Sequence, residues 1–155
     1  MKQERMKEMA AAKLSVKELE RLLRDAFPEM LHDGGGYVLE AVWHGGCRVR
    51  QRPDRQSLRP GGTVSGPAMM TLADFAVYVA ILATIGWVPL AVTTSLSINF
   101  LKMPAPRDLL AEARLLKLGK RLAVGEVDIR SEGADELVAH ATATYSIPPH
   151  GPSAR

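Results

Sequence analysis

One acidic residue, Asp74, lies within an apolar stretch that runs from residue 67 to residue 85. Thr71 comes three residues before Asp74 and Tyr78 four residues after it, so all three side chains share one face if the stretch is helical. A carboxylate on a helix that is apolar on nearly every side needs hydrogen-bond partners or a chemical task. The spacing makes Asp74 a candidate general base or nucleophile, and a structural aspartate bonded to a neighbouring strand or subunit is the alternative.

The residues around this stretch carry helix start and stop signals. Pro67 suits the first helical position, because its missing N–H would have no partner there; Gly66 is then the expected N-cap residue, with Ser65 just outside. Gly86 is the glycine typical of a helix end. The stretch is long enough to cross a membrane, but Asp74 near its middle would cost about 3 kcal/mol on insertion. The sequence holds no second run of this length, so we expect a helix buried in a protein core and no membrane partner.

The composition narrows the class of protein. A chain of 155 residues suggests one domain, and a net charge of +3 with only 5% aromatic residues argues against a nucleic-acid partner. Cys47 is the only cysteine, which excludes an internal disulfide and a thiolate metal cluster. The charged N-terminus has no apolar core of a signal peptide, so we expect a cytoplasmic protein.

Residues 1–33 are expected to form an N-terminal helical extension. The first 13 residues are polar and charged, and we expect them to fray. Ser15 and Glu18 then match a capping box, in which each side chain bonds the other residue's backbone N–H. An apolar stripe predicts a short amphipathic helix that ends near Phe27 and packs on the domain rather than carrying chemistry.

Residues 34–147 are expected to form the main domain. Alternation over 37–50 predicts one strand, weakened or bulged at Gly45-Gly46, and a polar loop over 51–63 leads to the central helix. Four strands follow, over 91–101, 109–118, 121–130 and 136–147, and residues 148–155 are expected to be a disordered tail. An antiparallel sheet wrapped around one apolar helix satisfies the burial requirement, so the predicted fold class is α+β.

Two of these strands have informative faces. Over 91–101, strict alternation assigns two sets of side chains to opposite faces: Val92, Thr94, Leu96, Ile98 and Phe100 on one, and Thr93, Ser95, Ser97 and Asn99 on the other. In the last strand one face carries Leu137, Ala139, Ala141, Ala143 and Tyr145. The small residues on that face predict the close approach of a helix.

This order of elements, with the motifs it carries, resembles the hotdog-fold acyl-CoA thioesterases of the PaaI-like group. The resemblance covers roughly residues 37–147, and its most specific parts are 65–74, 96–101, 110–114 with 119–124, and 139–145. It implies a hotdog fold, hydrolysis of acyl- or aroyl-CoA, and a homodimer that can pair into a tetramer. It also implies no metal and no cofactor beyond the coenzyme A of the substrate.

The family's site residues can be carried over position by position. The helix of the family usually begins with His-Gly-Gly, and these positions are Ser65, Gly66 and Pro67 here. The resemblance implies that the Gly66 N–H polarises the thioester carbonyl and that Asp74, nine residues after the histidine position, is the catalytic carboxylate. It also implies that Tyr78 helps to position the carboxylate or the water. Ser65 and Pro67 depart from the family pattern.

The chemistry follows from physical principles as well. A thioester carbonyl gains negative charge during hydrolysis, and a helix N-terminus offers N–H groups, expected here from Gly66, Ala68 and Met69. Gly66 and Asp74 are eight residues apart, about 12 Å along a helix axis. Both must lie within about 3 Å of one reacting group, so we expect Asp74 to come from a second subunit with an antiparallel helix.

Other residues are candidates for contacts with the rest of the substrate. Lys117, Lys120 and Arg121 cluster at a predicted hairpin that this family often places near the nucleotide, and a solvated turn is the alternative. Thr94 and Asn99 could line the pantetheine or acyl channel, or be ordinary strand residues.

Two alternative functions stay open. A hotdog protein could bind acyl-CoA without turnover, and the departure from the family pattern at Ser65 is the best support for this alternative. Hydratase chemistry normally needs a histidine paired with a carboxylate, and the candidates His44 and His140 do not lie on the central helix.

Overall fold

The computed structural model describes residues 10–149. The elements along the chain are α2 (Val16–Ala26), β1 (Tyr37–Trp43), β2 (Gly46–Gln51), α3 (Gly66–Ile85), β3 (Val92–Phe100), β4 (Leu109–Leu118), β5 (Leu122–Ser131) and β6 (Leu137–Ser146). The predicted frayed start and disordered tail concern mainly residues 1–9 and 150–155, which lie outside the described residues.

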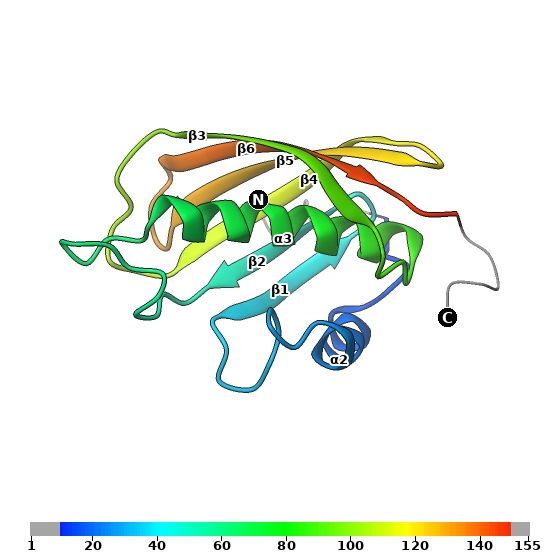
Figure 1. The fold of residues 1–155 in the computed structure, drawn as a ribbon, viewed down its shortest axis with the longest axis horizontal. Helices are drawn as coiled ribbons and strands as arrows, with labels where there is room; N and C mark the ends of the chain where they lie inside the picture. Colours follow the sequence, from blue (N-terminus) through cyan, green and yellow to red (C-terminus); the bar gives the residue numbers. More distant parts are fainter. Residues whose placement is uncertain (1–9, 150–155) are drawn as a thin grey trace.

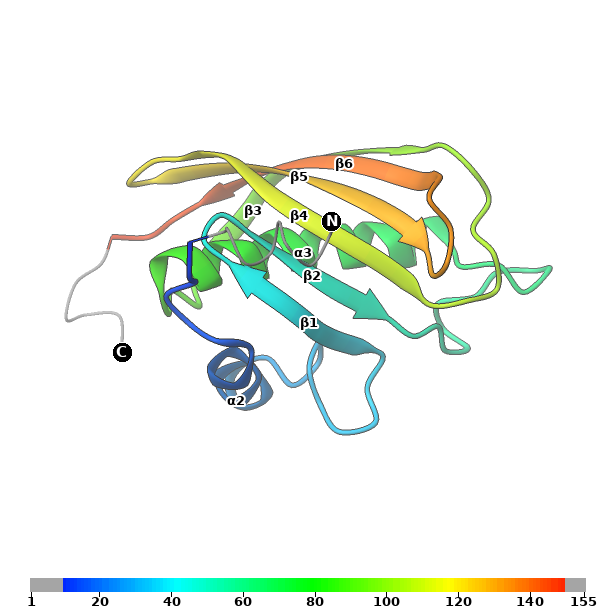
Figure 2. The ribbon, with the colours of Figure 1, turned by 180° about the vertical axis from the view of Figure 1, so that it is seen from behind.

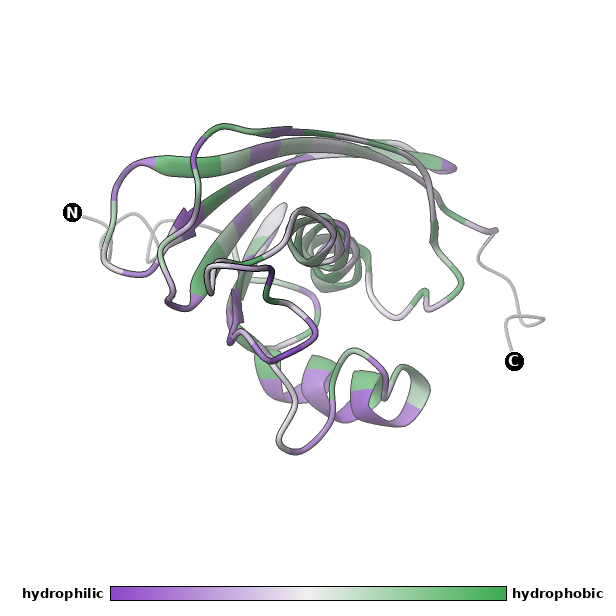
Figure 3. Ribbon diagram, turned by 60° about the vertical axis from the view of Figure 1, so that its left-hand side comes forward, coloured by the Kyte–Doolittle hydropathy of each residue, from purple (hydrophilic) through white to green (hydrophobic). Residues whose placement is uncertain are grey.

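The six strands form one antiparallel sheet in the order β1-β2-β4-β5-β6-β3. The sheet curves around α3, which lies against its concave face, and α2 lies outside β1 (Figures 1 and 2). Figure 3, which looks nearly along α3, shows this curvature end-on. The predicted α+β hotdog architecture, with an extra N-terminal helix, is confirmed.

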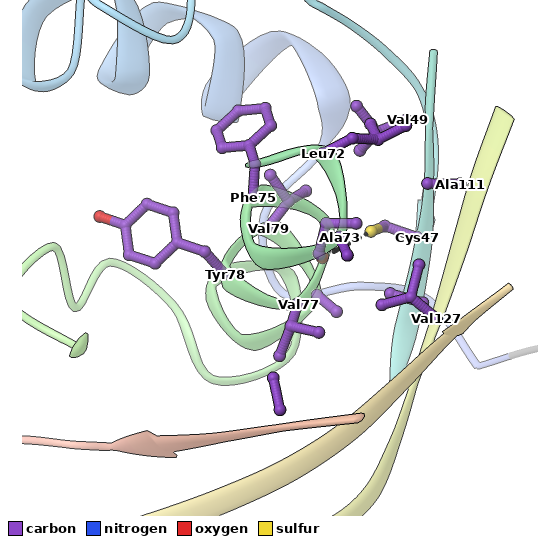
Figure 4. Close-up of a cluster of buried hydrophobic side chains, with 14 of the residues drawn as sticks. Cys47, Val49, Leu72, Ala73, Phe75, Val77, Tyr78, Val79, Ala111 and Val127 are labelled. Atoms are coloured by element: carbon purple, nitrogen blue, oxygen red, sulfur yellow. Dashed lines mark hydrogen bonds between the residues drawn. The ribbon is translucent and has the colours of Figure 1, made fainter. Parts of the chain in front are cut away.

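α3 is the core of the molecule. Thirteen of its twenty residues are buried, as are the alanines of β6 that face it. Gly125 of β5 shows how close the contact is, because a Cβ there would lie 3.1 Å from Cγ1 of Val77. α3 has the length and composition of a membrane span, but its apolar surface is covered by the sheet, as expected for a core helix (Figure 4).

Two predictions about local structure were wrong. The single strand expected over 37–50 is a β1–β2 hairpin, because Gly45 adopts a φ of +89° that turns the chain back. The N-cap of α3 is Ser65 rather than Gly66, because the Ser65 hydroxyl accepts a hydrogen bond from the Ala68 N–H at 3.3 Å.

The N-terminal extension is tied to the domain. The described part of the segment expected to fray, residues 10–13, is bonded instead: Ala10 O accepts from the His44 N–H at 2.9 Å, and the Lys13 N–H donates to Ala83 O at 2.7 Å. The capping box of Ser15 and Glu18 is confirmed, with both hydrogen bonds at 3.2 Å.

β3 contains an irregularity that matters for the site. Its pairing with β6 shifts between Thr93 and Ser95, which leaves Thr94 as an extra residue. Such a bulge reverses the alternation of faces before it. Thr93, Leu96 and Ile98 therefore share the face toward α3, and the prediction that put Thr93 on the opposite face was wrong.

Candidate active site

Asp74 lies near the middle of α3, half-buried, with one carboxylate oxygen held by two hydroxyl groups. The Thr93 hydroxyl donates to Oδ1 at 2.6 Å and the Tyr145 hydroxyl donates to the same oxygen at 2.7 Å. The Tyr145 hydroxyl also lies 2.8 Å from the backbone carbonyl oxygen of Asp74. Among residues 10–149, no group donates a hydrogen bond to Oδ2 of Asp74. One oxygen is thus fixed and the other is available to a ligand.

Tyr145 is built to act as a donor. Its side chain is only 3% exposed, and its ring stacks on that of Tyr78 with centroids 6.3 Å apart. Burial raises the pKa of the Tyr145 phenol far above its ordinary value. The hydroxyl therefore keeps its proton at any working pH and orients Asp74 without taking part in proton exchange.

Tyr78 and Thr71 do share a face with Asp74, as the spacing predicts, and all three line one cavity. Neither side chain bonds the carboxylate, however. The Tyr78 hydroxyl donates to Pro89 O at 2.9 Å, and the Thr71 hydroxyl donates back to Pro67 O at 3.0 Å. Burial raises the pKa of Tyr78 to about 12. The contacts that position the carboxylate, which were expected from Tyr78, are thus made by Thr93 and Tyr145.

Thr93 and Tyr145 are the site residues that sequence reasoning missed. The face on which Thr93 lies could not be predicted, because strict alternation does not reveal the bulge at Thr94. Tyr145 had a visible signal, because the alternation of the last strand already placed it among the alanines that face the helix. A polar side chain on that face must meet a polar partner on α3.

We expect Tyr145→Phe to lower kcat for the predicted thioester hydrolysis about tenfold, because a hydrogen bond to a charged group contributes roughly 1.5–3 kcal/mol. The steady-state rate at saturating substrate measures this effect. Tyr37→Phe is the control, because the Tyr37 hydroxyl bonds Gln51 and not Asp74. An unchanged kcat in Tyr145→Phe would contradict the positioning role.

The start of α3 offers fewer free N–H groups than expected. The Ala68 N–H is taken by the Ser65 hydroxyl, the Met69 N–H donates to Ser65 O at 3.2 Å, and Pro67 has none. Within the described part of the chain, the Gly66 N–H has no acceptor. Of the three N–H donors predicted for a thioester carbonyl, only that of Gly66 is therefore free among the described residues.

Gly66 and Asp74 do not open into the same cavity. Gly66 lines a cavity of about 420 Å³ with Arg59 and Phe100, whereas Asp74 lines a separate cavity of about 460 Å³ between α3, β3 and the end of α2. Ser65 and Pro67 line a third, more polar cavity of about 810 Å³. One chain therefore keeps the proposed donor and the proposed carboxylate apart, in agreement with the helix geometry.

The remaining candidates lie away from Asp74. Lys117, Lys120 and Arg121 are exposed around the β4–β5 hairpin, at the other end of the molecule from the start of α3 (Figure 1). Asn99 is exposed and pairs with His140 on the outer face of the sheet, and the Thr94 hydroxyl donates to Thr144 O at 3.2 Å. The structure does not bring any of these five residues to the Asp74 cavity.

The two histidines considered for hydratase chemistry are also remote from Asp74. His140 Nε2 lies 3.1 Å from Glu126 on the outer face, and His44 is exposed in the β1–β2 turn. His140 does have the histidine–carboxylate pair of hydratases, but the pair belongs to an ion-pair network that includes Arg114 and Asp128. This network covers the solvent side of the sheet rather than a cavity.

The sequence matches known proteins over most of its length. Residues 61–143 match the profile of the thioesterase superfamily. A candidate esterase of Saccharolobus solfataricus is 32% identical over 135 residues, which make up 86% of this chain and 86% of that protein.

Two solved structures extend this similarity to the fold. A candidate thioesterase of a Silicibacter species is 43% identical with a TM-score of 0.81, and the match covers 92% of this chain and 97% of that one. The phenylacetic acid degradation protein PaaI of Thermus thermophilus, solved as a mutant, is 27% identical with a TM-score of 0.66, covering 78% of this chain and 99% of that one.

Proposed function

The chain belongs to the thioesterase superfamily, and from this premise we propose that it hydrolyses acyl-CoA thioesters to a free acid and coenzyme A. The observation that carries the proposal is Asp74, a half-buried carboxylate with Oδ1 held by Thr93 and Tyr145 and with Oδ2 free to meet a ligand. A carboxylate that is oriented through one oxygen and open at the other has the arrangement that a general base or nucleophile needs.

In the proposed reaction Asp74 either activates water or attacks the thioester itself. In the first route Oδ2 takes a proton from water, the hydroxyl oxygen bonds to the carbonyl carbon, and the carbonyl oxygen becomes negative beside the Gly66 N–H of the other subunit. The C–S bond then breaks, and the sulfur of coenzyme A leaves with the proton from Asp74. In the second route Oδ2 bonds to the carbonyl carbon, the C–S bond breaks, and the coenzyme A thiolate leaves and takes a proton from solvent. Water then cleaves the acyl-aspartate anhydride, which releases the free acid and restores the Asp74 carboxylate. Neither route needs a cofactor beyond the substrate's own coenzyme A.

We propose that the active unit is a homodimer joined through β3. α2 packs over β1 and covers that edge of the sheet, whereas seven of the nine residues of β3, at the other edge, are exposed. Large apolar side chains are exposed in and beside β3: Leu90, Val92, Phe100, Leu101 and Met103. Two β3 strands paired about a twofold axis would bury this surface and bring the two α3 helices antiparallel. Tetramer formation from such dimers is compatible with this arrangement.

The proposal is tested by thiol release from acetyl-, hexanoyl-, dodecanoyl-, palmitoyl-, benzoyl- and phenylacetyl-CoA. We expect release from at least one ester, and the preferred ester names the substrate class. No release from any of them would overturn the proposal.

The protein's own thiol should not disturb this assay. Cys47 is fully buried, its thiol donates to Ala76 O at 3.0 Å, and burial raises the pKa of that thiol. Because the thiolate is the reactive form, a disulfide reagent should modify Cys47 only after unfolding. Titration of native and guanidinium-unfolded protein measures this, and rapid reaction of the native protein would contradict the buried position.

A binding protein without turnover is the second candidate. The observation that favours it is the start of α3, where Ser65 and Pro67 leave the Gly66 N–H as the one free donor among the first residues. Calorimetric titration with a non-hydrolysable acyl-CoA thioether separates the two candidates. Tight binding together with no thiol release would support the second.

A further inference from the structure

One wall of the cavity that holds Asp74 comes from the N-terminal extension. Ala26, Phe27 and Met30, at the end of α2 and in the turn after it, face Phe75 and Tyr78 of α3 across a space of about 460 Å³. The profile match to the superfamily, over residues 61–143, does not include this wall. The N-terminal extension thus supplies one side of the cavity and α3 supplies the other.

The wall is held firmly in place. Leu19 and Leu23 of α2 are fully buried against the domain, and the Phe27 N–H closes the helix by donating to Leu23 O at 2.7 Å. The turn that follows is fixed by the Met30 N–H, which donates to Phe27 O at 3.1 Å, and by the buried side chain of Leu31. Phe27 and Met30 thus have a defined position relative to Asp74.

The surface on both sides of this cavity is apolar and rich in aromatic rings. The Phe27 ring meets the Tyr78 ring edge-to-face with centroids 6.1 Å apart, yet Phe27 remains 37% exposed. Phe75 and Tyr78 leave α3 on the side away from Cys47 and the strand that carries it (Figure 4). Since the Tyr78 hydroxyl is already bonded to Pro89 O, the wall near Asp74 offers a ligand mainly carbon surface.

Met30 marks the boundary of this apolar space. Met30 and Thr71 line both the Asp74 cavity and the polar cavity of about 810 Å³ at the start of α3, so the two side chains stand between them. The polar cavity includes Arg52, Asp54 and Ser57, which do not suit a hydrocarbon chain. An apolar group that enters beside Asp74 would therefore meet its limit at Met30.

We propose that Phe27 and Met30 determine acyl-group specificity: the apolar acyl group lies between α2 and α3, with Phe27 along its side and Met30 at its end. This inference rests on the proposed thioester hydrolysis at Asp74, and it assigns to α2 a role in substrate selection. A flexible methionine is well suited to end such a space, because its side chain adapts to the group it meets.

The test compares kcat/KM across the same acyl-CoA esters for wild type, Met30→Ala, Met30→Phe and Phe27→Ala. Met30→Ala should move the optimum to longer chains and change the ratio of long to short esters about tenfold, in line with the discrimination that one or two methylenes give. Met30→Phe should move the optimum to shorter acyl chains. Phe27→Ala should lower kcat/KM for the preferred ester through KM, because it removes binding surface and leaves the reacting groups in place.

Leu22→Ala is the matched control, because Leu22 is a half-buried residue of α2 that does not line the cavity. It should keep the wild-type chain-length profile even if it lowers the melting temperature. Profiles of both Met30 variants that equal wild type, or a Leu22→Ala profile that shifts in the same way as Met30→Ala, would overturn the inference. A wild-type protein that cleaves no ester would instead defeat the proposed hydrolysis, so the two failures are distinguishable.

Discussion

Asp74→Asn is expected to lower kcat for acyl-CoA hydrolysis by about a thousandfold, in the range measured for the loss of a general base. The substitution is nearly isosteric. The amide oxygen can still accept hydrogen bonds from Thr93 and Tyr145, so the fold and the cavity should persist. What is lost is the negative charge that takes a proton from water or attacks the carbonyl carbon. The measurement is the initial rate of thiol release with the preferred ester.

Asp25→Asn is the control for the charge change, because Asp25 is exposed on α2 and lines none of the three cavities. It should retain the wild-type rate. Asp74→Asn should also keep binding the acyl-CoA thioether, since the apolar wall is intact. An Asp74→Asn protein that retains more than about a tenth of the wild-type rate would remove Asp74 from the centre of the mechanism, given the size of the expected loss.

The paired substitution Ser95→Lys/Ser97→Lys should separate the dimer and lower kcat/KM at least about a hundredfold, because each site would lose the N–H donor of the other subunit. Both serines are exposed on β3, so lysines there should not disturb the fold of one chain. In a twofold pairing of β3 strands the new positive charges would face their own copies, and edge lysines oppose strand pairing. Light scattering after size exclusion gives the mass, and the same fractions give the rate.

Thr142→Lys/Thr144→Lys is a closely matched control. These residues pair with Ser97 and Ser95 in the register of β3 and β6, so the same two charges would sit one strand away from the edge. The control protein should remain dimeric and active. A Ser95→Lys/Ser97→Lys protein that stays dimeric would place the interface elsewhere, and a monomer with the wild-type rate would show that one chain holds a complete site.

The sequence predicted the layers of this fold well because its signals are local. A helix apolar on nearly every side, a capping box at Ser15 and four strands separated by turn residues are each encoded by neighbouring residues, and all of them are present. The errors also have local causes. Gly45 was interpreted as a bulge, although its positive φ makes a hairpin turn, and Gly66 was preferred as a cap although the Ser65 hydroxyl can accept a hydrogen bond and glycine has no side chain to do so.

The sequence alone made Asp74 a candidate reactive group, because a carboxylate surrounded by apolar residues needs hydrogen-bond partners or a chemical task. It could not identify the residues that compensate it. Tyr145 is 71 residues away from Asp74, and the two meet only because β6 lies beside β3 in the sheet and both strands pack on α3. Thr93 reaches Asp74 because a bulge reverses the faces of β3 before Ser95. The bulge arises from the pairing of β3 with β6, and the order of residues within β3 does not reveal it. The same holds for Phe27 and Met30. Periodicity predicted the helix that ends just before them, but only the packing of α2 and its following turn beside α3 made them a wall of the cavity.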